Sequence, residues 1–476
     1  MNPKLSTIVL GGLSWSFGSR MVSNLAQLLI YFILARVLEP VEFGIMASLT
    51  VFINLSNMFA TAGLGNANIQ MKETDEKRYS TIFYLCLGLS ILLYLIIFLS
   101  APALSSVLNI TENFDSLLQI YGLTISLAVI SSMQISQLSR ALEFKKIFYC
   151  STIPSILAGV VSIIFAYRGF GIYALIANVG IARILSILLY SLYYPMFPKF
   201  GFNIDIAKTS SMYSGNLFTA SLLDELYRSS MVILIGKFYN TTLLGYYNVG
   251  RQIPGFISNT LNATVASVIF PVFSGLQDDL KRGKEMLRKS LRTLNITIFP
   301  VLSLMIILTD EIIIFLLTDK WLPIAPYLKL FTIILGLHHI YMSSTAYINS
   351  LGESFVTLKY NILNKLFAAL ILFLTYEKGV EAIVFGQLIV IILLHLFNMI
   401  PSKIYIRYSY KEQIEDFAPA FLTNLFLFII FSHLKLDINS LFLTIVFVTS
   451  LYLILYSIII YTMRFQVLDD WRQLIK

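Results

Sequence analysis

Apolar runs of about 20 residues recur along the whole chain, and each is long enough to cross a bilayer core of about 30 Å. In hydrocarbon every backbone N–H and C=O must be paired internally, so such runs fold as helices or closed barrels. The runs lack the alternation typical of barrel strands, and the sequence therefore predicts an all-α polytopic membrane protein. We expect about fourteen transmembrane helices, centred near residues 25, 52, 93, 127, 159, 183, 224, 259, 302, 337, 366, 390, 424 and 451.

The composition supports this class and argues against a soluble enzyme. The chain is 57% hydrophobic and 13% charged, whereas a soluble domain carries about 25% charge. No phosphate-binding loop, nucleophile elbow or metal-spaced cluster is present, so we expect no enzyme activity, no metal and no cofactor. Cys86 and Cys150 fall in or beside spans, where we interpret them as small apolar residues rather than a disulfide.

The positive charge is distributed unevenly between alternate connections. Of the 34 Lys and Arg residues, 22 fall in connections on the side of the N-terminus, 6 in the opposite connections and 6 inside spans. Cytoplasmic connections of membrane proteins are enriched in Lys and Arg. The distribution predicts that both termini are cytoplasmic, and it accounts for the net charge of +8 without a nucleic-acid partner.

The chain also contains a weak internal repeat. A shift of 201 residues aligns 34–44 (LARVLEPVEFG) with 235–245 (IGKFYNTTLLG), and a shift of 208 aligns 171–176 with 379–384. An even number of spans per repeat makes the two copies parallel, and substrate sites in such transporters lie between the repeats. We expect a six-helix lobe over 1–208, a second six-helix lobe over 209–403, and two additional helices with a cytoplasmic tail over 404–476.

One face of the first span is polar. Arg20, Asn24, Gln27 and Tyr31 are spaced i, i+4, i+7 and i+11, which places them on a single stripe of a helix. An arginine at membrane depth costs about 2.5–3.5 kcal/mol on insertion scales, so it should face protein or water rather than lipid. The stripe predicts a hydrated, positively charged cavity that suits an anionic substrate.

The seventh span carries three charges near its midpoint. Asp224 and Glu225 lie four and three residues before Arg228, so the charges can pair locally. Under the 201-residue shift, Asn24 corresponds to Glu225 and Gln27 to Arg228. One interpretation is a self-neutralising cluster that holds the lobes together. The other is a cavity wall in which Asp224 or Glu225 couples an ion and Arg228 binds anions.

Other polar residues inside spans are further candidates for the cavity. Asn248 and Arg251 share a face of the eighth span, Arg183 lies in the middle of the sixth, and Lys365 lies in the eleventh. Each base has the alternative of a snorkelling or locally paired side chain. His338 and His339 of the tenth span suit either buried packing, the favoured interpretation, or a proton relay.

Several short motifs occur in a fixed order along the chain. They are 34–44 (LARVLEPVEFG), 63–70 (GLGNANIQ), 140–146 (RALEFKK), 169–175 (GFGIYAL), 235–237 (IGK) with 244–248 (LGYYN), and 270–277 (FPVFSGLQ). In order and spacing these motifs resemble the polysaccharide transporter family of bacterial oligosaccharide and O-antigen flippases. They cover roughly residues 10–290 closely, and the remainder is similar in layout only.

The resemblance implies the fold of the multidrug/oligosaccharidyl-lipid/polysaccharide (MOP) exporters, in which two six-helix lobes surround a cavity and work by alternating access. It implies transport of undecaprenyl-diphosphate-linked oligosaccharide from the cytoplasmic to the periplasmic leaflet of the inner membrane. That step serves lipopolysaccharide, capsule or exopolysaccharide biosynthesis. By position, Arg20, Arg228 and Arg251 are the expected substrate-binding cations.

The expected partners are the lipid-linked substrate and membrane lipids. A polysaccharide polymerase and a chain-length regulator of the same pathway are further expected partners. The protein itself is expected to be a monomer. The alternative function is a cation-coupled multidrug exporter of the same fold. Cationic drugs need acids in the cavity, whereas bases outnumber acids within these spans.

Overall fold

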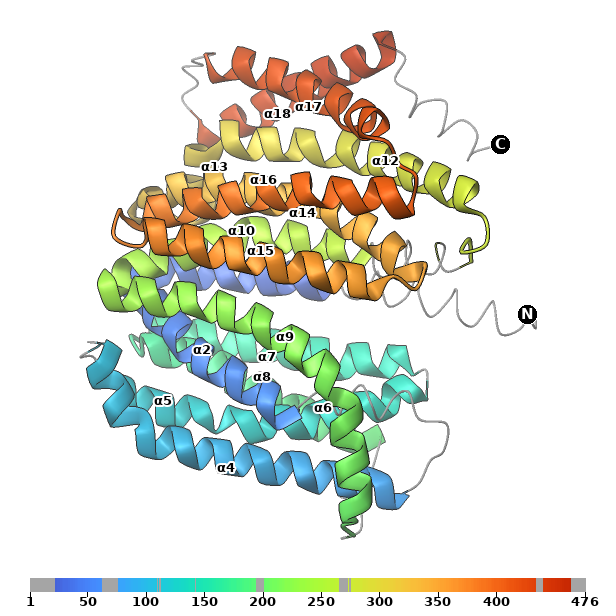
Figure 1. The fold of residues 1–476 in the computed structure, drawn as a ribbon. Helices are drawn as coiled ribbons and strands as arrows, with labels where there is room; N and C mark the ends of the chain where they lie inside the picture. The colour runs from blue at the N-terminus through green and yellow to red at the C-terminus, as the bar shows by residue number, and fades with distance from the viewer. Residues whose placement is uncertain are drawn as a thin grey trace. The chain divides into compact units, whose positions relative to one another are not determined.

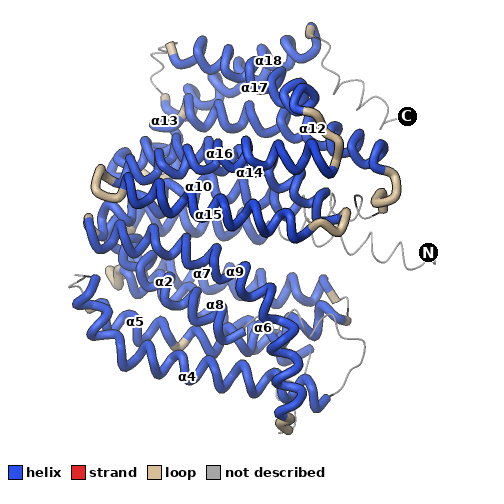
Figure 2. Tube along the Cα trace, in the orientation of Figure 1, coloured by secondary structure: helices blue, strands red, loops and turns tan. Residues whose placement is uncertain are grey.

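The computed structural model describes residues 22–61, 76–108, 110, 113–141, 143–193, 201–264, 273, 275–433 and 440–463, without the side chains of 209–221 and 260–264. Every regular element within these residues is a helix (Figures 1 and 2). The chain divides into two compact units, 1–248 and 249–476. This boundary falls within a helix rather than in a loop, and the division into lobes at residue 208 stays a prediction.

The first unit contains eight of the described helices and the start of a ninth. Their bounds are Val22–Val37, α2 (Pro40–Thr61), α4 (Glu76–Leu108), α5 (Phe114–Gly122), α6 (Thr124–Arg140), α7 (Phe144–Tyr167), α8 (Ile172–Tyr193), α9 (Ile204–Phe238) and α10 (Thr241–Thr264), which continues into the second unit.

The second unit contains the remaining described elements. They are α12 (Leu280–Ile307), α13 (Thr309–Leu316), the 3₁₀ helix η2 (Asp319–Ile324), α14 (Ala325–Ser350), α15 (Ser354–Thr375), α16 (Val380–Tyr405), α17 (Tyr410–Ser432) and α18 (Leu441–Thr462).

Each unit has an apolar core of its own. In the first unit, α2, α4, α5, α6 and α8 bury side chains such as Leu49, Phe83 and Phe114 against one another. In the second, α12, α17 and α18 pack around Phe299, Leu427 and Tyr452. The last two helices therefore share a core with α12.

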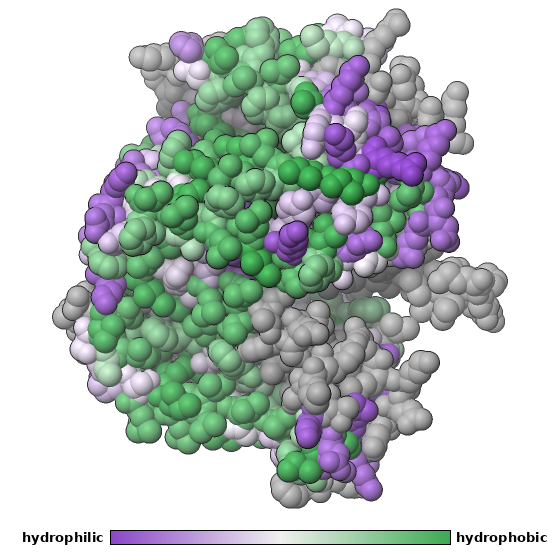
Figure 3. Space-filling view, viewed as in Figure 1, coloured by the Kyte–Doolittle hydropathy of each residue, from purple (hydrophilic) through white to green (hydrophobic). Residues whose placement is uncertain are grey.

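The helices are long and apolar enough for a membrane protein. Eleven of them meet the length and composition expected of a span within the described residues. Their apolar side chains cover the middle of the visible surface, while hydrophilic residues gather towards helix ends (Figure 3). The all-α polytopic class is thus confirmed, and the count of fourteen spans stays a prediction.

Two local features agree with the sequence analysis. Cys86 and Cys150 are buried free thiols, as expected for small apolar residues. Gly171 and Gly379, which the 208-residue shift aligns, have φ angles of 54° and 106° and directly precede α8 and α16. Both glycines have a positive φ, which favours glycine, so this one pair of aligned positions shares a feature of backbone conformation.

Candidate substrate-binding site

The polar stripe of the first span is only partly described. Arg20 lies outside the described residues. Asn24 and Gln27 lie on the helix Val22–Val37, where Asn24 is half-buried and Gln27 is exposed. At the far end of the stripe, the ring of Tyr31 meets that of Phe43 edge-on at 5.5 Å between centroids. The stripe thus runs from an exposed amide to a tyrosine that packs against α2.

The three charges of α9 form a loose cluster. Arg228 Nε lies 3.8 Å from Glu225 Oε2, and 54% of the Arg228 side chain is exposed. Ser229 Oγ donates to Glu225 Oε1 at 3.5 Å. Asp224 is also exposed. The local pairing expected from the spacing is present, but an arginine this exposed keeps most of its donors available to a ligand.

The two candidates on α10 lie on one face, three residues apart. Asn248 and Arg251 are both half-buried. Neither side chain forms a hydrogen bond or ion pair with any residue that the structure describes. A partly buried guanidinium without a carboxylate partner is available to bind an anion. The predicted roles of Asn248 and Arg251 in substrate binding stay predictions.

The helices that carry these candidates differ from the others in composition. The helix Val22–Val37, α9 and α10 are not among the eleven that meet the criteria for a span, because the first is short in its described part and the others carry many polar residues. A polar face on a spanning helix must be turned towards protein or water. The helices with the most candidates are therefore also the ones least suited to lipid on all sides.

Arg183 lies inside the first unit. Its Nη1 donates to Ser131 Oγ of α6 at 3.2 Å. One turn further along, Gln134 Nε2 contacts Ile187 O and Ser191 Oγ of α8, both at 3.4 Å. Arg183 thus belongs to a polar contact between α6 and α8, and its predicted role in substrate binding stays a prediction.

In the second unit, Lys365 is half-buried on α15 and has interactions of its own. Tyr341 of α14 donates a short hydrogen bond to Asn361 Oδ1, one turn before Lys365. His339 is 1% exposed, and its ring nitrogens contact Gly336 O at 2.6 Å and Asn295 Oδ1 at 2.9 Å. This is the environment of a packing histidine, the favoured of the two interpretations.

A charged junction between α12 and α17 was not anticipated. Arg288 Nε and Nη2 donate to the two carboxylate oxygens of Asp416 at 2.7 and 3.1 Å, and Nη1 donates to Glu412 at 3.0 Å. Lys284 Nζ donates to the same Glu412 oxygen at 2.9 Å, and Arg292 Nε lies 3.4 Å from Asp416. From the sequence alone, these bases indicate only the topology.

The junction is fixed by neutral groups as well. Tyr408 Oη donates to Asp416 Oδ2 at 2.8 Å, and Asn295 Nδ2 donates to Asp416 O at 3.0 Å. Burial, and secondarily the Asp416 carboxylate, raises the pKa of the Tyr408 phenol, which therefore stays a donor. Ser409 and Glu412 form a capping box at the start of α17. The junction is a fully partnered structural cluster.

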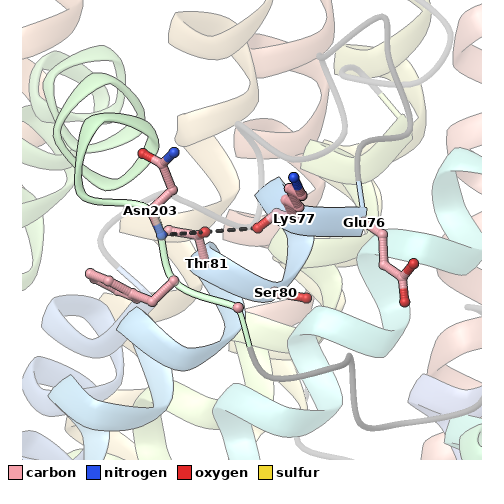
Figure 4. Close-up of a pocket in the computed structure, with 7 residues that line it drawn as sticks. Glu76, Lys77, Ser80, Thr81 and Asn203 are labelled. Carbon is pink, nitrogen blue, oxygen red and sulfur yellow. Dashed lines mark hydrogen bonds between the residues drawn. The ribbon is translucent and has the colours of Figure 1, made fainter.

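A partly open pocket of about 450 Å³ lies where α4 begins beside the start of α9. Its polar groups include Asn203 N, which donates to Thr81 Oγ1 at 3.1 Å, while Thr81 donates to Lys77 O at 2.7 Å (Figure 4). Asn203 also caps α9 through its side chain. The pocket contains none of the predicted site residues, and its hydrogen bonds serve to hold α4 against α9.

The fold is similar to that of known exporters. A lipid II flippase, MurJ, in an inward closed conformation aligns with a TM-score of 0.73 at 16% identity, covering 94% of this chain and 99% of that one. An inward-facing multidrug resistance MATE transporter of the MOP superfamily aligns at 0.61 and 14% identity, covering 82% and 96%. The fold is therefore that of the MOP exporters.

The chain belongs to the family described as polysaccharide biosynthesis protein, whose model matches residues 33–326. The succinoglycan biosynthesis transport protein ExoT of Rhizobium meliloti (strain 1021) is 24% identical over 68% of this chain and 65% of its own length. The lipopolysaccharide biosynthesis protein WzxC of Escherichia coli (strain K12) is 24% identical over 68% of this chain and 66% of its own. The match thus spans slightly less than two thirds of these two relatives.

A further relative is the teichuronic acid biosynthesis protein TuaB of Bacillus subtilis (strain 168), 22% identical over 70% of this chain and 69% of its own length. The names of these relatives refer to three different glycans. The resemblance found in the sequence motifs is confirmed at the level of the family and the fold.

Proposed function

We propose that this protein is a flippase for undecaprenyl-diphosphate-linked oligosaccharide repeat units in the bacterial inner membrane. It moves them from the cytoplasmic to the periplasmic leaflet by alternating access, with both of its own termini in the cytoplasm. The observation that carries this proposal is the family match over residues 33–326, together with a fold like that of a lipid II flippase. The glycan belongs to lipopolysaccharide, capsule or exopolysaccharide biosynthesis.

The chemistry of the candidate residues supports an anionic headgroup. Guanidinium groups bind phosphate oxygens through paired, charge-assisted hydrogen bonds. Arg251 has no partner within the described residues, and Arg228 is half exposed. Amides such as Asn24, Gln27 and Asn248 suit sugar hydroxyls, which both donate and accept. A cationic drug, the substrate of the alternative exporter, would meet Arg251 as a like charge.

In the proposed cycle the bases hold the diphosphate while the lipid tail stays in the bilayer. Arg20, Arg251 and Arg228 bind the phosphates. Arg183 and Lys365 add positive charge. Asp224 and Glu225 couple the cycle to a cation or proton gradient, because Glu225 lies within reach of Arg228 and protonation of the carboxylate would release the base. The lipid-linked substrate is the principal partner. A polysaccharide polymerase and a chain-length regulator then act on the translocated repeat units. The transporter itself works as a monomer.

The test of the binding role is translocation of a fluorescent undecaprenyl-diphosphate disaccharide in proteoliposomes. We expect Arg251→Ala to reduce translocation at least tenfold, about the 1.4 kcal/mol of one lost charge-assisted contact, with unchanged protein yield. Arg168→Ala is the matched control, because Arg168 is an exposed base between α7 and α8. Normal translocation by both Arg251→Ala and Arg20→Ala would reject the cavity assignment.

Coupling is tested with Glu225→Gln in the same vesicles, with and without an imposed proton or sodium gradient. We expect the gradient to accelerate translocation by the native protein and to have little effect on the variant. A variant that responds to the gradient as the native protein does would remove Glu225 from this role. The same comparison with Asp224→Asn assigns the coupling to one of the two acids.

A further inference from the structure

The pocket between the starts of α4 and α9 has the dimensions of a ligand site. Its volume of about 450 Å³ falls within the range of about 300–1,000 Å³ that small-molecule sites occupy. One side consists of the first two turns of α4, and the other consists of residues 201–203, which directly precede α9. Both helices belong to the first unit, so the pocket lies within a single compact body.

Some of its polar groups are used to join the two helices. The Thr81 hydroxyl accepts from Asn203 N at 3.1 Å and donates to Lys77 O at 2.7 Å (Figure 4). Asn203 Oδ1 accepts from the backbone N–H groups of Asp205 and Ile206, at 2.9 and 3.2 Å. These bonds fix both walls and hold the Asn203 amide in one orientation.

Other polar groups at the pocket are left over. The Ser80 hydroxyl has no hydrogen-bond partner among the described residues, although Ser80 is only 2% exposed. In the same part of the chain, Asn203 Nδ2 and the Glu76 carboxylate also lack a partner. Leaving a buried polar group unpaired costs about 1–3 kcal/mol, so such groups normally have a partner. The pocket therefore offers donors and an acceptor to a polar ligand.

The pocket also presents an aromatic ring. Phe202 is 51% exposed, and its ring stacks on no aromatic ring that the structure describes. It directly precedes Asn203, whose cap on α9 holds this part of the backbone in place. An exposed ring beside hydrogen-bonding groups suits a ligand with one apolar face and a polar rim.

The charges at the pocket favour a neutral ligand over an anion. Glu76 and Lys77 contribute one charge of each sign, and Lys77 has interactions of its own. An anion would meet the Glu76 carboxylate as a like charge. The ring of a sugar fits the whole set, because its hydroxyls both donate and accept while one face carries C–H groups. Its hydroxyls can accept from Asn203 Nδ2 and donate to Glu76, with the C–H face on Phe202.

We propose that this pocket binds a sugar residue of the lipid-linked oligosaccharide before translocation and so selects the glycan. The inference rests on the proposed function for the source of the sugar. By the distribution of Lys and Arg, the starts of α4 and α9 lie at the cytoplasmic end. Thr81 directly precedes the apolar run of α4, so the pocket lies at the membrane surface, level with the sugars of a lipid in that leaflet.

The sugar pocket is separate from the candidate phosphate-binding cations. Arg228 lies 24 residues after Ile204 on α9, which is about 36 Å along the helix at 1.5 Å per residue. A sugar in the pocket therefore identifies the glycan at entry, and the diphosphate reaches the arginines in a later step.

Saturation-transfer NMR tests the binding of a sugar directly. The protein in nanodiscs is mixed in turn with the methyl glycosides of glucose, galactose, rhamnose and N-acetylglucosamine. We expect saturation to pass from the native protein to at least one of them, and Phe202→Ala to abolish the transfer. Phe170→Ala is the matched control, because Phe170 is 53% exposed in the connection between α7 and α8 and should leave the transfer intact.

Asn203→Ser tests the amide while keeping the helix cap, since serine caps helices about as well as asparagine. We expect the affinity for the glycoside to fall about fivefold, as for the loss of one hydrogen bond. Asn240 is the matched control, because its Oδ1 accepts from Leu243 N at 2.7 Å at the start of α10. Asn240→Ser should bind the glycoside as the native protein does.

Translocation in proteoliposomes identifies the source of the sugar. Asn203→Ser should raise the KM about fivefold for a fluorescent undecaprenyl-diphosphate disaccharide that carries the sugar found to bind. The KM for a disaccharide lipid built from a sugar that does not bind should stay unchanged. A merely structural role of Asn203 would change both values alike.

The outcomes separate the site from the proposed function. Saturation transfer that is absent, or equal in the native protein and Phe202→Ala, would overturn the sugar site. Transfer that requires Phe202, with translocation unaffected by Asn203→Ser, would overturn the assignment to the transported glycan. A native protein that binds the glycoside but moves no lipid-linked sugar would instead refute the proposed function and leave the sugar site standing.

Discussion

The arginines of α12 and those of α9 and α10 show two opposite uses of the same side chain. Arg288 is 19% exposed and contacts Asp416, Glu412 and Glu415 of α17. Arg228 is 54% exposed, and its nearest carboxylate oxygen is 3.8 Å away. Arg251 has no partner in the described part of the chain. Arg288 thus holds α12 against α17, whereas Arg228 is only loosely paired and Arg251 is unpaired among the described residues.

The energetic consequences of the two arrangements differ accordingly. Removing one partner of a buried ion pair leaves an uncompensated charge, which typically costs about 3–5 kcal/mol. An exposed pair contributes about 0–1 kcal/mol. Substitutions at the junction should therefore affect folding first, and substitutions on α9 and α10 should affect transport first.

Asp416→Asn should have the largest effect on stability. Asp416 is 2% exposed and holds Arg288 and Arg292, so the variant should lower the free energy of unfolding by about 3–5 kcal/mol. Denaturant or thermal unfolding in detergent measures the change. Glu415→Gln is the control, because Glu415 is 51% exposed on the same helix and should cost less than about 1 kcal/mol. Equal stability of the two variants would contradict a structural role for the junction.

Asn295→Leu should have the next largest effect. Asn295 is 2% exposed and links His339 of α14 to the backbone of α17. Its loss leaves buried polar groups unpaired, which should cost about 1–3 kcal/mol in the free energy of unfolding. Thr297→Val, an exposed site on the same helix, should stay within about 0.5 kcal/mol. If Asn295→Leu left the free energy of unfolding unchanged, the junction would be stabilised by its ion pairs alone.

Ser409→Ala removes the capping box of α17 and should cost about 1 kcal/mol. The measurement is again the unfolding midpoint of the purified protein. Ser432→Ala, at the exposed other end of α17, serves as the reference. If both variants unfold alike, the ion pairs alone determine how α17 begins.

Glu225→Gln should have the smallest effect on stability, within about 1 kcal/mol, because its partner Arg228 is half exposed. Its unfolding curve should nearly coincide with that of the native protein even where its response to a gradient is lost. A loss of stability as large as that of Asp416→Asn would instead show that the charges of α9 stabilise the fold as strongly as those between α12 and α17.

Much of the fold follows from local information. The length of the apolar runs predicts helices, and the spacing of Glu225 and Arg228 predicts their contact, because i and i+3 share a helix face. The 201-residue shift also aligns Gly44 of α2 with Gly245 of α10, and each of these glycines lies against a first-turn carbonyl of the other helix.

The junction could not be predicted in the same way. Arg288 and Asp416 are 128 residues apart, and nothing in either local pattern indicates the other. The bases of α12 also matched a simpler explanation, the enrichment of cytoplasmic connections in Lys and Arg. For Arg251, the sequence indicated a base at membrane depth, but only the structure shows that no carboxylate among the described residues accompanies it.

The distance along the chain between Arg288 and Asp416 has a consequence for biogenesis. Synthesis proceeds from the N-terminus, so α12 enters the membrane well before α17 leaves the ribosome. During that interval Lys284, Arg288 and Arg292 lack their carboxylate partners. The face of α12 that later packs against α17 is not yet covered by it. The last two helices therefore complete the protein, and a nascent chain that stops before Tyr410 should be recognised and degraded by membrane proteases.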